Sequence, residues 1–339
     1  MKNWRISSIR TAAPKRTAVL LLLALLTLAA AVLSLSLGAV SIPPADVLQG
    51  LFGRGGNVAI IRYVRLPRTC GALLAGMSLA VSGAVIQSVL ANPLAAPNMI
   101  GVNAGAGLAT ALCCALAPTA LAVTPVAAFL GALAGVMLVL FIAERTGAAR
   151  ITLVLAGVAV SSMFSAGVDA VLTFFPDSLN GYSDFRIGGL SNLSMDRIIP
   201  AFWVALIAVA LIFSLCGEMD VLALGLETAQ SLGLRARPLR LLLLTLAAAL
   251  AGAAVSFAGL LGFIGLLIPH IMRRLVGEES LPLMLGCALG GASLLTLCDL
   301  LSRLLFAPYE LPVGIVLALM GGPFFIYLLL RQRRGRIHD

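Results

Sequence analysis

The stretch LRLLLLTLAAALAGAAVSFAGLLGFIGLLIPHIM, residues 239–272, is an almost unbroken apolar run of 34 residues. As a single helix it would be roughly 50 Å long, which exceeds a hydrocarbon core of about 30 Å. Arginines flank it on both sides, at 235–240 and at 273–274. Because loops on the cytoplasmic side are enriched in arginine and lysine, both flanks belong on that side. We therefore expect two crossings here, joined by a tight turn near Gly259 or Gly262.

The chain as a whole has the composition of a membrane protein. Of its 339 residues 60% are hydrophobic and 11% are charged, and the mean hydropathy is +1.07, whereas a soluble domain carries about 25% charged residues. Only helices and closed barrels satisfy the backbone in lipid, and these apolar runs lack the alternation of barrel strands. The sequence predicts an all-α polytopic fold with about ten transmembrane helices. The predicted spans are 17–40, 66–90, 98–118, 122–143, 151–174, 198–216, 239–257, 259–275, 282–304 and 312–330.

Positive charge sorts to one side of these spans. If both termini are cytoplasmic, most of the 23 lysines and arginines lie inside, which supports an even number of crossings. The chain then divides into a basic cytoplasmic N-terminus (1–16), one transmembrane domain (17–330) and a basic cytoplasmic C-terminus (331–339). The net charge of +9 follows from this topology, and its dispersal among helix ends argues against a nucleic-acid partner.

The sequence contains no motif for an energy source or a catalytic centre. A Walker A loop needs a lysine to hold phosphates, and the only lysines are Lys2 and Lys15. The patterns HExxH and GxSxG are also missing. The six cysteines lack paired spacing, and His270 and His338 are too scattered to form a metal site. We expect a non-catalytic chain without a metal or cofactor, so any ATP and Mg²⁺ would be bound by another polypeptide.

Two carboxylates fall inside predicted spans. Asp169 is a candidate for the transport pathway because a carboxylate is costly inside a membrane, although local pairing near the interface would also explain it. It equally supports an alternative function, an ion-coupled secondary transporter, although no convincing internal repeat accompanies it. Asp299 precedes Arg303 by four residues, a spacing that predicts a structural ion pair on one helix face.

Several arginines lie on the predicted outer side. Arg62, Arg65 and Arg68 gather around the start of the second span and Arg303 lies at the end of the ninth, against the usual distribution of positive charge. An acidic docking partner or an anionic substrate would explain them. Snorkelling at the interface, or internal pairing with Asp46 or Glu310, would explain them as well. Charge alone leaves these explanations open.

Glycines set four residues apart recur in the spans, and such pairs let helix backbones approach closely in a bundle. They are Gly101 and Gly105, Gly131 and Gly135, and Gly286 and Gly290. The longest inside loop, VLALGLETAQSLGLRARP at 221–238, has leucines among polar positions and breaks at two glycines. It predicts two short amphipathic helices, which would dock on a cytoplasmic protein or lie flat on the membrane.

Four blocks in order along the chain resemble the FecCD-like permeases, which import iron–siderophore complexes, haem or cobalamin. The blocks are RLPRTCGALLAGMSLAVSGAVIQSVLANPLAAPNMIGVNAGA (65–106), LALGLETAQSLGL (222–234), GFIGLLIPHIMRRLVG (262–277) and ELPVGIVLALMGGPFFIYLLL (310–330). The resemblance implies a type II ATP-binding-cassette (ABC) importer in a bacterial inner membrane. Two ten-span permeases, identical or merely similar, would surround a central pathway, with two cytoplasmic ATPases and an external substrate-binding protein.

The resemblance also implies roles for individual residues. Arg65 and Arg68, with Arg303, resemble arginines that receive acidic residues on the two lobes of the binding protein. Asn92 and Leu94 resemble positions that narrow the cytoplasmic end of the pathway. The block from 222 resembles helices that couple the permease to its ATPases, and the coupling residues it implies are Leu222, Gly225, Glu227, Leu232 and Gly233.

Overall fold

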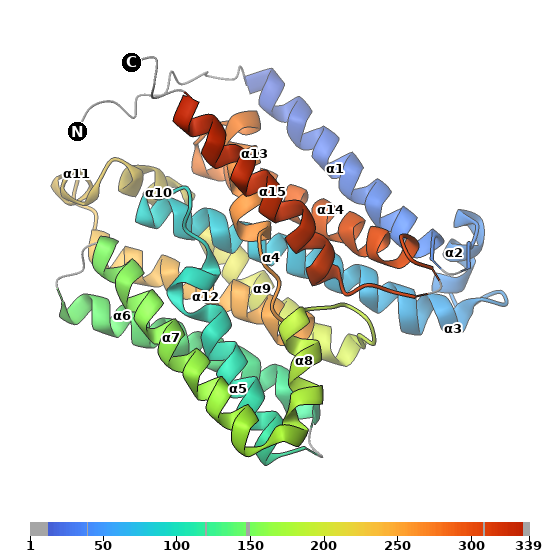
Figure 1. The fold of residues 1–339 in the computed structure, drawn as a ribbon. Coiled ribbons are helices and arrows are strands. Elements are labelled where there is room, and N and C mark those ends of the chain that lie inside the picture. The colour runs from blue at the N-terminus through green and yellow to red at the C-terminus, as the bar shows by residue number, and fades with distance from the viewer. Residues whose placement is uncertain (1–12, 39, 119–120, 147–149, 308, 335–339) are drawn as a thin grey trace.

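A computed structural model describes residues 13–38, 40–118, 121–146, 150–307 and 309–334 of the chain (Figure 1). Most of the predicted basic termini lie outside these residues. Throughout the described part every regular element is a helix, so the predicted all-α class is confirmed. Each predicted span coincides with a helix. These helices are α1 (Ala13–Ser36), α4 (Leu66–Leu90), α5 (Val102–Leu116), α6 (Thr124–Arg145), α7 (Arg150–Phe174), α9 (Met195–Ser214), α12 (Ala236–Ala258), α13 (Ile264–Val276), α14 (Ser280–Leu304) and α15 (Val313–Arg334).

The ten helices differ in how much of a membrane they can cross. In the described residues, seven are long and apolar enough to span it alone, including one continuous run at Val58–Leu90 that leads into α4. The others are shorter: α5, α13 and the apolar part of α15, Val313–Tyr327. At about 1.5 Å per residue, the 13 residues of α13 cover roughly 20 Å, about two thirds of the hydrocarbon core.

Shorter elements connect the long helices, and several of them lie toward the two ends of the bundle. In Figure 1 the start of α1, the end of α15 and α11 lie at one end, which the arginine distribution assigns to the cytoplasm, while α2, α3 and α8 lie toward the other. The short elements are α2 (Pro44–Leu51), α3 (Val58–Ile60), η1 (Ile61–Arg65), η2 (Pro97–Ile100), η3 (Leu121–Val123), η4 (Pro176–Ser178), α8 (Leu179–Ile187), α10 (Cys216–Ala223) and α11 (Leu226–Ser231).

The predicted turn inside the 34-residue apolar run is confirmed, because α12 ends at Ala258 and α13 begins at Ile264. Backbone groups at this turn, which have no partner within a helix, form hydrogen bonds with the end of α8 and the residues that follow it. The Leu260 N–H donates to the Phe185 carbonyl at 2.9 Å, and the Gly189 N–H donates to the Ala258 carbonyl at 2.9 Å. Non-helical backbone at membrane depth is tolerated only where protein or water surrounds it. Here neighbouring protein supplies the missing partners.

Glycines bring the helix backbones into direct contact. A Cβ atom at Gly105 would lie 2.1 Å from the carbonyl oxygen of Gly131, and one at Gly135 would lie 2.6 Å from that of Gly101. The predicted pairs on α5 and α6 therefore pack against each other, which is the close approach that small residues permit in lipid. The pair on α14, Gly286 and Gly290, faces the side chain of Met272 instead.

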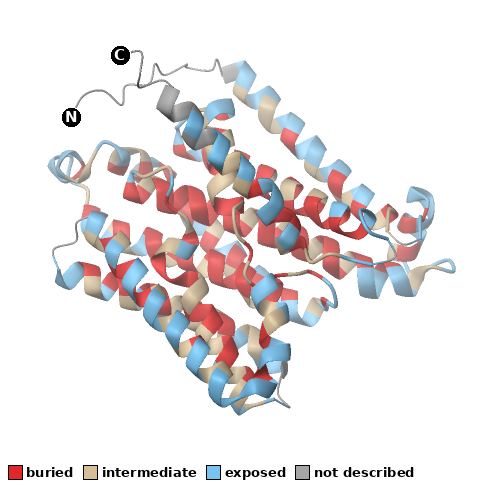
Figure 2. Cartoon of the chain, viewed as in Figure 1, coloured by how far each residue is buried: buried red, intermediate tan, exposed pale blue. Residues whose placement is uncertain are grey.

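Burial separates central helices from peripheral ones (Figure 2). In the best spanning window of each helix, 83% of the α4 residues are buried but only 17% of the α1 residues. Helix α1 presents leucines such as Leu21, Leu22 and Leu25 on its open face. An apolar face of this kind is suited to contact with lipid. The small residues, by contrast, lie between the helices, where they allow close packing.

Candidate functional site

An ion-pair cluster joins the outer ends of α4 and α14. Arg68 Nε donates to Asp299 Oδ1 at 2.9 Å, and Arg303 Nη2 lies 3.2 Å from Asp299 Oδ2. Arg68 Nη1 also donates to Glu310 Oε2 at 2.6 Å. The predicted pair of Asp299 with Arg303 is confirmed, and so is the predicted alternative of pairing an outer arginine with Glu310. These four residues, together with Arg65, form the outer cluster.

Two arginines of the outer cluster also cap helix α1. Arg65 Nη1 donates to the carbonyls of Leu35 and Ser36, each at 2.7 Å, and its other terminal nitrogen donates to Val40. Arg303 Nη2 donates to Ser34 Oγ at 2.7 Å. The last carbonyls of a helix lack intrahelical partners and carry partial negative charge. The arginines therefore stabilise the end of α1 and tie it to α4 and α14.

The outer cluster is enclosed by the chain itself. Arg65, Arg68 and Arg303 are 4%, 7% and 5% exposed, and Asp299 is 0% exposed. Their charge is paired within the chain, as the internal-pairing explanation predicts. Docking of a partner on them stays a prediction. Arg62, which was predicted to belong to this outer group, is exposed; Arg54, Arg186 and Arg197 are exposed as well and were not predicted.

Asp169 lies in an open groove on α7 that is lined by both polar and apolar residues. The groove has a volume of about 520 Å³, and its polar lining includes Ser161, Ser165 and Asn98 of η2. Ser161, Ser165 and Asp169 are spaced by four residues, so they share one helix face. A side-chain partner for Asp169 is not found among the described residues, so the local pairing proposed for it is not seen there. A polar face of this kind is costly against lipid and suits water or protein.

The loop after α4 carries the two predicted gate residues. Ala91 adopts left-handed backbone (φ 45°) at the end of α4, and Asn92 Oδ1 then accepts the Leu94 N–H at 3.0 Å. This side-chain turn stabilises the loop. The side chain of Asn92 therefore fixes the conformation of the loop, and the side chain of Leu94 extends from this loop.

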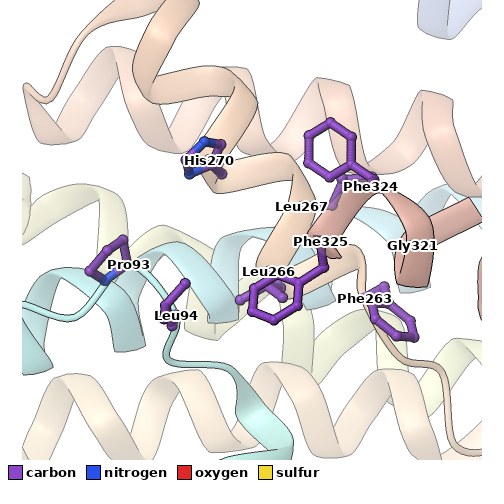
Figure 3. Close-up of a pocket in the computed structure, with 9 residues that line it drawn as sticks. All are labelled: Pro93, Leu94, Phe263, Leu266, Leu267, His270, Gly321, Phe324 and Phe325. Atoms are coloured by element: carbon purple, nitrogen blue, oxygen red, sulfur yellow. The ribbon is translucent and has the colours of Figure 1, made fainter. Parts of the chain in front are cut away.

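Leu94 faces a narrow apolar crevice between α13 and α15. Figure 3 shows Leu94 and Pro93 opposite Leu266 and Phe325, with His270 at one end. The free volume is about 10 Å³, room for roughly one water molecule. The placement of Leu94 is consistent with a narrowing of the cytoplasmic end, and its role as a gate stays a prediction. The aromatic residues of α15 that complete the crevice were not predicted, although they lie in the block GGPFF.

The cytoplasmic segment forms two short helices, as its pattern predicts, although the first begins earlier than expected, at Cys216. Both predicted breaks have positive φ, 112° at Gly225 and 85° at Gly233. Leu232 is 64% exposed and Glu227 is also exposed, so both can contact another protein. Leu222 is 6% exposed and packs in the core. Its predicted contact with an ATPase stays a prediction.

Leu224 is the apolar residue that the structure exposes in place of Leu222. It is 64% exposed, at the turn between α10 and α11. Leu222 and Leu224 lie two positions apart, and such neighbours point to different sides of a helix. The sequence pattern shows the spacing but not which side meets the core.

The family comparison agrees with the four sequence blocks. The sequence model described as the FecCD transport family matches residues 22–331, which is most of the chain. The chain belongs to the FecCD transport family. The family assignment predicted from the blocks is thereby confirmed, and with it the interpretation of the chain as a transport permease.

Individual relatives of this FecCD-family chain cover nearly its full length. The Fe(3+)-citrate import system permease protein YfmE of Bacillus subtilis is 38% identical over 318 residues, covering 93% of this chain and 95% of the relative. The hemin transport system permease protein HmuU of Yersinia pestis is 39% identical, covering 80% and 84%. A solved structure of a metal-chelate type ABC transporter in an inward-facing conformation matches with a TM-score of 0.82 and 30% identity, covering 93% and 99%.

In this FecCD-family chain the outer cluster, the groove and the crevice occupy different depths of the bundle. The outer cluster lies at the end of α14 near Arg303, and the groove runs along α7 at Asp169. The crevice at Leu94 follows the end of α4, which lies toward the cytoplasmic end, where α10 and α11 project.

Proposed function

We propose that this chain is the permease subunit of an ABC importer that takes up an iron complex across a bacterial inner membrane. The names of its relatives support ferric citrate, haem and siderophores as the cargo class. Cobalamin, which the sequence resemblance also implies, stays a prediction. The observation that carries the proposal is the match of residues 22–331 to the FecCD transport family, together with near-full-length relatives that are named as permeases for iron complexes.

We place a second permease subunit, identical or similar, against the groove on α7. One subunit leaves Asp169 on an open face, whereas two facing grooves would enclose a path away from lipid. A dimer of cytoplasmic ATPases would bind α10 and α11, and an external binding protein would deliver the iron complex. ATP and Mg²⁺ would bind to the ATPases.

The outer cluster suggests how the binding protein docks. Glu310 is its most exposed acidic member, with 43% of its side chain accessible, and it is paired with Arg68. A carboxylate on the binding protein could replace Glu310 at Arg68 without leaving the arginine unpaired. Charge complementarity of this kind steers association and fixes the orientation of partners. Docking would then loosen the outer end of α14 while ATP closes the ATPases, which biases the permease between its two states.

An ion-coupled secondary transporter is the second candidate, favoured by the accessible position of Asp169. The two functions differ in their energy source. We expect uptake of a ferric chelate into proteoliposomes to require the permease, its ATPase, ATP and the loaded binding protein. Ionophores that collapse proton and sodium gradients should leave that uptake unchanged. Accumulation of the chelate by the permease alone, driven by an ion gradient, would refute the ABC proposal and support the alternative.

The ATPase contact can be tested at Leu232. Replacing Leu232 with glutamate should reduce ATP-driven uptake about tenfold or more, because exposed apolar side chains that anchor an interface lose that contact when charged. Leu232→Met keeps an apolar side chain and should preserve uptake. Co-purification of the ATPase and uptake are both measured. Gly225 is a poorer test site, because its φ of 112° strains any replacement. Wild-type uptake by Leu232→Glu would contradict the assigned contact.

A further inference from the structure

The carboxylate of Asp220 on α10 caps helix α14 across 60 residues of sequence. Its Oδ1 accepts the backbone N–H of Ser280 at 2.9 Å and the Ser280 hydroxyl at 2.6 Å. Ser280 is the first residue of α14 and is buried. The first N–H groups of a helix have no intrahelical acceptor, and the positive end of the helix dipole favours a carboxylate there. Asp220 meets both needs.

The residue directly before α14 does not supply the capping side chain. Glu279 occupies the position before α14 and makes no side-chain bond to the helix start. Its carboxylate is paired with Arg16 of α1 instead. Because the residue in the usual capping place is used elsewhere, the start of α14 depends on a different helix for its acceptor. A cap supplied by another helix also fixes the position of that helix.

Helix α10 is the first half of the cytoplasmic helix pair. Cys216, Met219 and Leu222 on one side of it are buried in the main core. The chain then turns at Gly225 into α11. A force applied to the exposed residues after α10 therefore acts on a short helix that is fixed by packing on one side and by Asp220 on another.

Helix α14 can carry a displacement across the membrane. Its 25 residues extend roughly 37 Å. It packs along α4, where a Cβ atom at Gly291 would lie 2.2 Å from the carbonyl oxygen of Gly76. Near its far end, Asp299 and Arg303 belong to the outer cluster. Helix α14 is therefore held by side-chain hydrogen bonds and ion pairs at both ends. Its first residue bonds to α10, and its last turns bond to the outer ends of α1 and α4.

We propose that Asp220 is a positioning residue that joins the ATPase-binding helices to α14, and through α14 to the outer cluster. This rests on the proposed function, because it assumes that α10 and α11 receive the ATPase. When the ATPases move α10, the bond to Ser280 draws the start of α14 with it. Without the bond, the ATPases can hydrolyse ATP while α14 stays in place.

The test uses the complete transporter, permease with ATPase and binding protein, in proteoliposomes. The measured quantity is the amount of ferric chelate taken up per ATP hydrolysed, which does not depend on how much complex is present. Asp220→Ala should lower this ratio about fivefold, because two charge-assisted hydrogen bonds are lost. Asp220→Asn retains an oxygen acceptor and should keep most of the ratio. Asp184→Ala removes an exposed carboxylate of α8, outside the helices assigned to the ATPase and without a side-chain hydrogen bond or ion pair within the described residues, and should match wild type.

Ser280→Ala removes only the hydroxyl bond and should give an intermediate ratio. In the Asp220→Ala background it should add nothing, because two residues that act through one contact are not additive. An unchanged ratio in Asp220→Ala would overturn the inference. If Asp220→Ala does not assemble, an unchanged ratio in Ser280→Ala would overturn it. Failure of the proposed function would look different, since the wild-type complex itself would then show no ATP-dependent uptake.

Discussion

Replacing Asp299 with alanine is expected to destabilise the folded permease by about 3–5 kcal/mol, the range measured when one partner of a buried ion pair is removed. Asp299 is fully buried and is paired with both Arg68 and Arg303. Without it, one arginine retains only the half-exposed Glu310 and the other retains only neutral acceptors. Thermal unfolding of the purified protein in detergent, compared with wild type, measures the loss.

Asp184→Ala is the control for this prediction. Asp184 is an exposed carboxylate of α8 without a side-chain hydrogen bond or ion pair among the described residues, so its loss should change stability by less than about 0.5 kcal/mol. A triple replacement of Arg68, Asp299 and Arg303 by methionine or leucine should be milder than Asp299→Ala, because no arginine is then left unpaired. Equal stability of Asp299→Ala and wild type would show that the outer cluster does not hold the bundle together.

Replacing Gly83 with valine is expected to separate α4 from α13 and to cost at least about 3 kcal/mol, at the upper end of overpacking effects. A Cβ atom at Gly83 would lie 1.9 Å from the carbonyl oxygen of Gly265 and 2.6 Å from its Cα. Backbone atoms cannot move aside as a flexible side chain can, so a helix must shift. Yield of monodisperse protein and its thermal unfolding in detergent report the effect.

Gly322→Ala is the matched control, because a Cβ atom there would meet nothing within 4 Å and the residue is also helical. Alanine at such a site is expected to be neutral or to stabilise by about 0.4–1 kcal/mol. If Gly83→Val were as stable as Gly322→Ala, α4 and α13 would not be in backbone contact.

Several features of the fold could be predicted from local sequence. A span needs a long apolar run whatever lies beside it, so hydropathy located all ten helices, and flanking arginines showed that residues 239–272 turn back. The Asp299–Arg303 pair was predictable because both residues are on one helix. The breaks at Gly225 and Gly233 were predictable for a similar reason, since glycine tolerates positive φ.

Features that depend on distant parts of the chain were predicted less well. In the sequence, Arg65 and Arg68 are positive charges near a helix end on the outer side. In the fold, a carbonyl of α1 accepts a hydrogen bond from Arg65, and a carboxylate of α14 pairs with Arg68. The sequence pattern does not distinguish Leu222 from Leu232, whereas in the fold Leu222 is buried in the core and Leu232 is exposed. The bond between Asp220 and Ser280 has no local signal, because its two residues lie 60 positions apart and only packing brings them together.

The sequence by itself determined the position of the ten long apolar helices and the family, because these follow from short-range hydropathy and motif order. Only the tertiary structure decided which arginines are buried, which leucines are exposed and which helix caps another. Burial and pairing are properties of the neighbours that a side chain meets, and in a helical bundle most of those neighbours come from elsewhere in the chain.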